Sequence, residues 1–315
     1  MQILYHALSA PFLLQAQAEK TYWLPPQSAE HAKEVDAVFY GIYWLSVFFF
    51  VLIAGLTILF VVKYRRKGET DAPISERAHN TPLEIGWTIL PTLIVAVIFF
   101  IGFHSYMRAA IPPENSYQVS VTGIKWNWMF TYPNGYIDNN LHVPVDTPVK
   151  LTITSEDVIH SVFIPNFRLK MDAVPGRYNV AWFNADEAGE YDLFCTEYCG
   201  TKHSEMLAKV VVHPPGEFET WLADASDFVK NLPPAEAGEK LYKVRGCAQC
   251  HSINGTAGIG PTFQGVYGKT EKMTDGSDIT VEDNYIRESI LNPQAKIVAG
   301  YQPVMPTYKG RIKDE

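Results

Sequence analysis

The hydrophobic positions predict two membrane-spanning helices in the first third of the chain. Residues 37–62 form a run of 26 positions without a charge, and residues 85–107 form a run of 23 interrupted only by His104. A helix that crosses a bilayer needs about 20 apolar residues. Two buried core helices are the alternative, but the lengths of both runs and the Phe48–Ile53 segment disfavour it. We therefore predict a transmembrane hairpin over residues 37–108.

Beyond the second run the pattern changes to short alternating segments. Residues 119–121, 149–153 and 209–212 alternate or cluster as strands do, and turn residues separate them. This spacing predicts an all-β sandwich or barrel within residues 109–232, followed by one helix over Phe218–Leu232. The pair Pro233 and Pro234 predicts a linker, and residues 233–315 then form a third, smaller domain.

Charges near the hydrophobic runs predict how the hairpin is oriented. The connecting loop contains five basic residues, whereas the outer flanks offer only Lys33 and Arg108; the five are Lys63, Arg65, Arg66, Lys67 and Arg77. The positive-inside rule places this loop in the cytoplasm and everything after Arg108 outside it. Residues 1–36 form an N-terminal segment whose Ala16–Ala18 end resembles a signal-peptide cleavage site, although a basic n-region is missing.

Net charge and cysteine count exclude several classes of protein. The net charge is −8, and residues 109–232 account for it with 16 acidic and 8 basic side chains. Nucleic-acid binding needs a basic face, so we exclude it. Four cysteines in 315 residues do not make a disulfide-rich scaffold, but they are enough for a metal or cofactor site.

The strongest chemical signal lies in a twelve-residue segment of the β domain. It combines two thiols, an imidazole and a thioether, and a second imidazole stands further upstream; the donors are Cys195, Cys199, His203, Met206 and His160. Soft sulfur donors together with imidazole select copper or zinc over hard cations. We therefore predict a metal site here rather than the alternative, a disulfide between Cys195 and Cys199.

The number of donors decides which metal is expected. A structural zinc takes four ligands and does not use methionine. One blue-copper ion needs a single cysteine, which leaves the second unexplained. Two copper ions bridged by both thiolates use all of the donors.

These residues resemble subunit II of haem–copper cytochrome c oxidases over residues 35–213. The resemblance rests on the cysteine loop and on four further segments, which are Trp87–Pro91, Trp126–Trp128, Val158–Ser161 and Leu169–Arg177. It implies a cupredoxin-like barrel that holds a dinuclear CuA centre. The implied copper ligands are His160, Cys195, the carbonyl of Glu197, Cys199, His203 and Met206.

The resemblance also implies roles for three further groups. Trp126 is then the point at which electrons reach CuA, although an ordinary barrel aromatic is the alternative. The Glu197 side chain reaches a magnesium ion at the interface with subunit I. Glu84 lies at the mouth of a proton channel. Independently of the family, Thr81, Pro82 and Glu84 predict a capping box that starts the second membrane helix, and this role is compatible with the other.

The third domain carries a Cys-x-x-Cys-His motif at Cys247, Cys250 and His251, which is typical of covalent c-type haem attachment. Residues 235–315 resemble a class I cytochrome c, an all-α fold. That resemblance implies His251 and Met305 as axial ligands and the Pro261 carbonyl as the group that orients His251. Met273 is a rival ligand, but no proline follows it. The family closes with a C-terminal helix that is missing after Lys313, so we expect the chain to be truncated.

A CuA domain fused to a cytochrome c resembles the caa3-type cytochrome c oxidase of bacterial inner membranes. We expect electrons to pass from haem c to CuA and on to haem a of subunit I, where oxygen reduction is coupled to proton pumping. Subunits I and III, membrane lipid and a donor cytochrome or upstream respiratory complex are the expected partners. A CuA subunit of a nitric oxide reductase, a copper-free quinol oxidase subunit and a membrane-anchored copper carrier are the alternatives.

Overall fold

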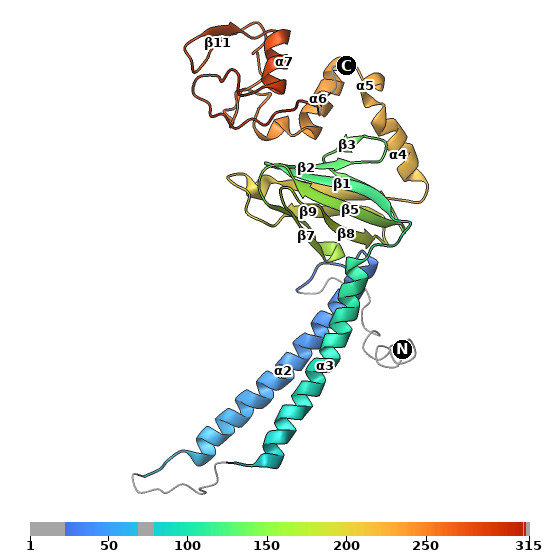
Figure 1. Cartoon of the computed structure of the whole chain (residues 1–315), viewed down its shortest axis with the longest axis vertical. Coiled ribbons are helices and arrows are strands. Elements are labelled where there is room, and N and C mark those ends of the chain that lie inside the picture. Colours follow the sequence, from blue (N-terminus) through green and yellow to red (C-terminus); the bar gives the residue numbers. More distant parts are fainter. Residues whose placement is uncertain (1–22, 69–78, 311, 313–315) are drawn as a thin grey trace.

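The computed structural model describes residues 23–68, 79–310 and 312. The predicted signal segment and Arg77 lie outside the described residues. The described chain forms three parts that follow one another along its long axis (Figure 1): a helical hairpin, a two-sheet β domain and a small C-terminal domain.

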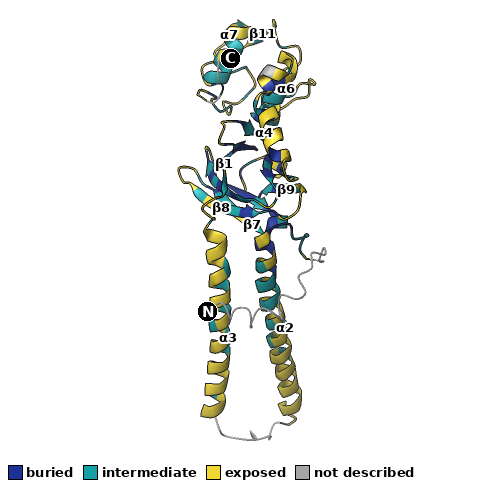
Figure 2. Ribbon diagram, turned by 90° about the vertical axis from the view of Figure 1, so that its right-hand side faces the viewer, coloured by how far each residue is buried: buried dark blue, intermediate teal, exposed yellow. Residues whose placement is uncertain are grey.

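The hairpin consists of α2 (Glu30–Tyr64) and α3 (Thr81–Ala110), both long and apolar enough to cross a membrane. Each helix extends beyond the predicted hydrophobic run, and the extra turns of α2 reach the β domain. The apolar side chains of both helices are largely exposed (Figure 2). Such a large exposed apolar surface indicates contact with lipid or with other membrane subunits, because exposing it to water would be unfavourable. The predicted transmembrane hairpin is confirmed.

The start of α3 differs by one position from the predicted capping box. The N-cap is Asn80 rather than Thr81, because the Asn80 side chain accepts a bond from the Leu83 amide at 3.4 Å. The Glu84 carboxylate accepts one in return from the Asn80 amide at 2.9 Å. Asparagine is a stronger N-cap than threonine, so the reciprocal pair of bonds forms with Asn80.

Two five-stranded sheets form the β domain, which confirms the predicted sandwich. The first contains, in spatial order, β3 (Ile137–Asp138), β2 (Asn127–Thr131), β1 (Tyr117–Ile124), β5 (Pro148–Ser155) and β8 (Asn179–Asn184). The second contains β4 (Leu141–Pro144), β10 (Leu207–His213), β9 (Gly189–Cys195), β6 (His160–Ile164) and β7 (Leu169–Ala173). Strand β5 alternates strictly between buried and half-buried residues, as expected for a strand with one face on the core.

Short helices connect the sandwich to the C-terminal domain. The predicted single helix over Phe218–Leu232 is wrong, since it is broken at Asp227 into α4 (Glu217–Ser226) and α5 (Phe228–Asn231). Pro234 begins α6 (Pro234–Val244) at a position where its missing N–H costs nothing. The domain continues with α7 (Asp283–Leu291) and a small hairpin of β11 (Thr270–Lys272) and β12 (Asp278–Thr280), which adds to the expected all-α fold.

A buried ion pair joins the membrane hairpin to the sandwich. Asp36 of α2 accepts two bonds from the Arg168 guanidinium, from Nε and from Nη2, both at 2.8 Å. The two side chains are only 4% and 8% accessible. A bidentate pair that is out of reach of water fixes both partners in orientation. The top of α2 is therefore rigidly attached to the domain that carries the candidate metal site.

A histidine pair lies where α4 covers the sandwich. His142 of β4 and His213 of β10 are neighbours across the parallel strands, with Nδ1 and Nε2 2.9 Å apart. The Trp221 ring of α4 stacks on His142 at 3.9 Å. Burial lowers the pKa of His142 most, and the nearby positive charges of His213 and Lys240 lower it further. The Asp138 carboxylate raises this pKa, but the net result is a pKa of about 4. His142 is thus neutral in the folded chain at neutral pH.

We expect the β domain to lose stability as the pH falls from about 6.5 to about 4. In this range the unfolded chain binds a proton at residue 142 and the folded chain does not, so acid favours unfolding by up to about 3 kcal/mol. Calorimetric unfolding at about pH 7 and about pH 4.5 measures the difference. His142→Phe keeps the stacking on Trp221 but cannot bind a proton, so its unfolding temperature should depend less on pH. An equal pH dependence in this variant would contradict the assignment.

Candidate functional site

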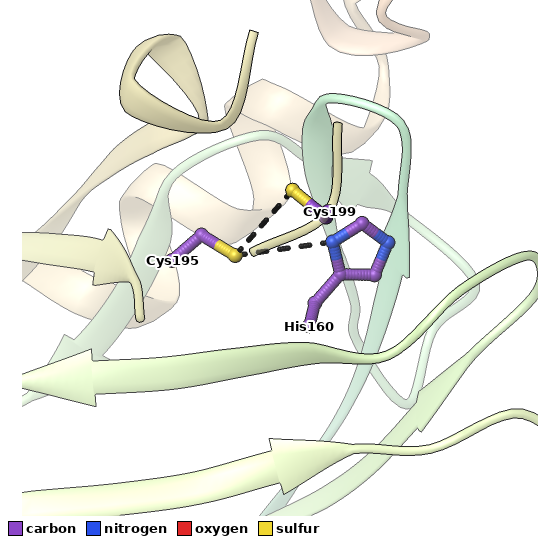
Figure 3. Close-up of side chains that lie close together, drawn as sticks. All are labelled: His160, Cys195 and Cys199. Atoms are coloured by element: carbon purple, nitrogen blue, oxygen red, sulfur yellow. Dashed lines mark hydrogen bonds between the residues drawn. The ribbon is translucent and has the colours of Figure 1, made fainter. Parts of the chain in front are cut away.

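The cysteine loop between β9 and β10 brings together the predicted donors. Strands β6 and β9 pair antiparallel with Val162 opposite Cys195, and this pairing carries His160 to the start of the loop. The Cys195 sulfur lies 3.9 Å from Nδ1 of His160, 3.8 Å from the Cys199 sulfur and 3.3 Å from the Glu197 carbonyl oxygen. Figure 3 shows the two sulfur atoms and the imidazole facing a common centre.

The second half of the donor set gathers around Cys199. Its sulfur lies 3.4 Å from Nδ1 of His203 and 3.8 Å from the thioether sulfur of Met206. A single turn of 3-10 helix, η2 (His203–Glu205), directs these two side chains back toward the cysteines. Each thiol therefore has one imidazole Nδ1 beside it, together with the Glu197 carbonyl at Cys195 and the Met206 thioether at Cys199. The six predicted ligand groups thus lie next to one another.

His160 is held in one orientation by groups that the sequence prediction did not include. Its Nε2 lies 2.9 Å from the Asp157 carboxylate, so the N–H there donates to Asp157 and leaves Nδ1 free for a metal. A side chain at Gly123 would place its Cβ 2.8 Å from His160 Cδ2, so only glycine fits against the ring. In the sequence, only the spacing of three residues between Asp157 and His160 could have indicated that the two side chains meet.

The two thiols differ in acidity. Burial raises the pKa of Cys195, but hydrogen bonds with His160 and with the backbone outweigh it and lower that pKa to about 6. Burial, together with the neighbouring Cys195 charge, raises the pKa of Cys199 to about 12. The pKa values of the two thiols are therefore shifted in opposite directions, and a bound cation would stabilise the ionised form of both sulfurs.

This donor set fits copper. Both cysteines are free thiols, and two sulfurs, two Nδ1 atoms, a thioether and a carbonyl lie within contact of one another. Thiolate and imidazole suit zinc as well as copper, but a buried thioether is a ligand of copper sites and not of structural zinc. Met206 is fully buried with its sulfur on the cluster, so the residues fit the copper centre expected from the sequence.

The Cys-x-x-Cys-His motif lies in the C-terminal domain just after α6. Cys247 and Cys250 flank a 3-10 turn, η3 (Cys247–Gln249), and both thiols are free. His251 Nδ1 lies 2.7 Å from the Pro261 carbonyl, which fixes the ring and leaves Nε2 available to an iron. A Cβ at Gly260 would lie 2.5 Å from His251 Cε1, so this glycine makes room for the imidazole. These residues fit covalent haem attachment.

The surroundings of the two candidate methionines differ. Met273 is buried, and its sulfur lies 3.9 Å from the Tyr285 hydroxyl, so its side chain is part of the packing of the domain. Met305 is only half-buried, in a segment without helix or strand, and Gln294 donates to its carbonyl oxygen at 3.4 Å. The choice of Met305 as the second haem ligand stays a prediction.

The remaining predicted residues lie in three different places. Trp126 sits at the β1–β2 turn against the cysteine loop, where a Cβ at Gly200 would lie 3.2 Å from its ring. The Glu197 side chain is exposed beside the copper donors. Glu84 lies at the opposite end of the hairpin, where it caps α3.

Comparisons with known proteins match three segments of the chain to family models. Residues 17–106 match the family described as cytochrome c oxidase subunit II, transmembrane domain, and residues 135–213 match the periplasmic domain of the same subunit. Residues 235–315 match the cytochrome c family.

Curated relatives cover most of the chain. Cytochrome c oxidase subunit 2 of Thermostichus vulcanus is 32% identical over 255 residues, covering 63% of this chain and 77% of the relative. The same subunit of Alkalihalophilus pseudofirmus is 31% identical, covering 81% of this chain and 77% of the relative. Among solved structures, the periplasmic domain of subunit II of the cytochrome oxidase of Bradyrhizobium japonicum is 30% identical, with a TM-score of 0.35, and the match covers 37% of this chain and 97% of that one.

Proposed function

Because the chain belongs to the cytochrome c oxidase subunit II family and carries a cytochrome c domain, we propose that it is the electron-transfer subunit of a caa3-type oxidase. The family makes it a component of an oxidoreductase complex that is anchored in a membrane by two helices. Its copper and haem c sites lie in separate domains of one chain.

One observation carries the proposal of a dinuclear CuA centre. The two cysteine sulfurs lie side by side, and each has its own imidazole Nδ1, His160 for Cys195 and His203 for Cys199. Two equivalent sets of donors around a shared pair of sulfurs suit two metal ions bridged by both thiolates. A single ion would leave part of the set unused.

When loaded, haem c and CuA supply one-electron redox chemistry that connects a donor protein with haem a of subunit I. The chain's own residues hold these groups in place. Asp157 orients His160, and the Pro261 carbonyl orients His251, so neither ligand has to reorganise when the charge of its site changes. Met305, as the second haem ligand besides His251, would raise the reduction potential of the haem.

Three further roles belong to the same proposal. Trp126 accepts electrons above the copper loop, and the exposed Glu197 carboxylate is free to bind a magnesium ion against subunit I. The basic loop between α2 and α3 faces the cytoplasm, which places both redox domains on the periplasmic side. Glu84 is then on the cytoplasmic side, where the protons that subunit I consumes and pumps are taken up. Subunit III and a donor cytochrome complete the set of partners.

We expect two copper ions and one covalent haem per full-length chain. Metal analysis and a haem assay on the purified, haem-loaded protein measure these two contents, and low-temperature EPR tests whether the coppers form one centre. The EPR spectrum should show one unpaired electron shared over two copper nuclei, because both thiolates bridge the pair. A mononuclear copper signal, or zinc in place of copper, would contradict the dinuclear assignment and leave the family membership intact.

A further inference from the structure

The C-terminal domain is docked on the β domain through the segment that carries the haem motif. Asn127, at the start of β2, donates from Nδ2 to the Val244 carbonyl at the end of α6, at 3.3 Å, and this bond is buried. Lys202, inside the copper loop, donates from Nζ to the Gln249 carbonyl between the two haem cysteines, at 2.6 Å. Figure 1 shows α6 next to the end of the sandwich that carries β2 and β3.

Close packing surrounds these two hydrogen bonds. Gly246 lies against Asn127, and a Cβ added there would come within 3.1 Å of the Asn127 side chain. Gly246 also has a φ of +76°, which glycine adopts without strain. Cys250 and Ile259 pack against the hydrophobic core that continues from the sandwich. There is therefore no room for a side chain at Gly246, and Cys250 and Ile259 add an apolar part to the contact between the two domains.

The dipeptide Trp126–Asn127 touches both redox sites. Trp126 packs on Gly200 of the copper loop, while Asn127 packs on Gly246 beside the first haem cysteine. Trp126 is only 9% exposed, and its Nε1 is buried without a hydrogen-bond partner among the described residues. In the folded chain Trp126 is thus buried against the copper loop, next to the residue on which the haem segment packs.

We propose that Lys202 and Asn127 form a built docking interface that holds the chain's own haem segment on the copper loop and closes Trp126 to external donors. This inference rests on the proposed function, since it assigns the occupant of the Trp126 face. A lysine of the acidic β domain supplies the polar contact to the haem segment. An external redox protein then delivers its electron to the haem domain, and Lys202 and Asn127 act as positioning residues.

Hydrogen exchange tests the docking without any redox step. In the haem- and copper-loaded full-length chain, Lys202→Met and Asn127→Ala should each increase amide exchange of residues 244–250 by about tenfold, because each removes one polar contact of the interface. Lys209→Met is the matched control, since the Lys209 side chain forms an ion pair with the exposed Asp192 of the same domain, and it should leave this exchange unchanged. Unchanged exchange in both interface variants would overturn the docking.

Rapid mixing with a reduced soluble cytochrome c tests the closure. In the parent chain, haem c should be reduced before CuA, and Lys202→Met should slow the second step by about tenfold at unchanged copper and haem content. Reduction of CuA ahead of haem c would overturn the closure of Trp126. A chain that lacks the two-copper EPR signal but shows the docked exchange pattern would refute the proposed function and leave the interface standing.

Discussion

Cys195→Ser is expected to abolish copper binding and to reduce oxidase turnover by more than about 100-fold, since loss of even a hydrogen-bond partner of a metal ligand lowers metal affinity or activity by about 10- to 100-fold. The Cys195 sulfur contacts His160, Cys199 and the Glu197 carbonyl at once, so it belongs to both halves of the donor set. A serine hydroxyl is a hard donor that remains protonated at neutral pH, and copper bound to soft ligands does not accept it in place of thiolate.

Metal analysis of the purified variant measures this effect directly. Thr201→Ser is the control, because Thr201 is exposed in the same loop and touches none of the donor atoms described above. It should retain two coppers and full turnover. A Cys195→Ser chain that keeps its copper would show that Cys195 is not a copper ligand.

Asp36→Ala is expected to destabilise the junction between α2 and the β domain by about 3–5 kcal/mol, the usual cost of leaving one charge of a buried pair alone. The Arg168 guanidinium is nearly inaccessible to water, and Asp36 is the acidic group bonded to it. Two backbone carbonyls, of Pro165 and Pro25, also accept from Arg168, so the side chain cannot swing out without losing further bonds.

Lys33→Ala provides the matched comparison for this prediction. Lys33 also joins α2 to the β domain, through an ion pair with Asp186, but both side chains of this pair are substantially exposed. Exposed pairs contribute at most about 1 kcal/mol. Calorimetry of the detergent-solubilised chain should therefore show a much lower unfolding temperature for Asp36→Ala than for Lys33→Ala. Equal unfolding temperatures would mean that solvent reaches Arg168.

Local patterns were sufficient for the hairpin and for strands β1, β5 and β10, whereas the other strands of the two sheets were not predicted. The run over residues 37–62 needs no partner to be recognised as a spanning helix, because its length matches the bilayer. The helix predicted over Phe218–Leu232 was wrong at Asp227, where α4 ends and α5 begins, and Trp221 of α4 and Phe228 of α5 both pack on Tyr136. The cap of α3 is Asn80 rather than the predicted Thr81, because asparagine is the stronger N-cap of the two.

By itself the sequence determined which chemistry to expect of this protein, because four candidate copper donors and the three residues of the haem motif lie in two short segments. Only the tertiary structure decided how distant groups meet. His160 reaches Cys195 through the pairing of β6 with β9, and Asp157 then selects the imidazole nitrogen that faces the metal. The docking of Gly246 on Asn127 joins residues more than 100 positions apart, and such contacts depend on packing, which local sequence does not encode.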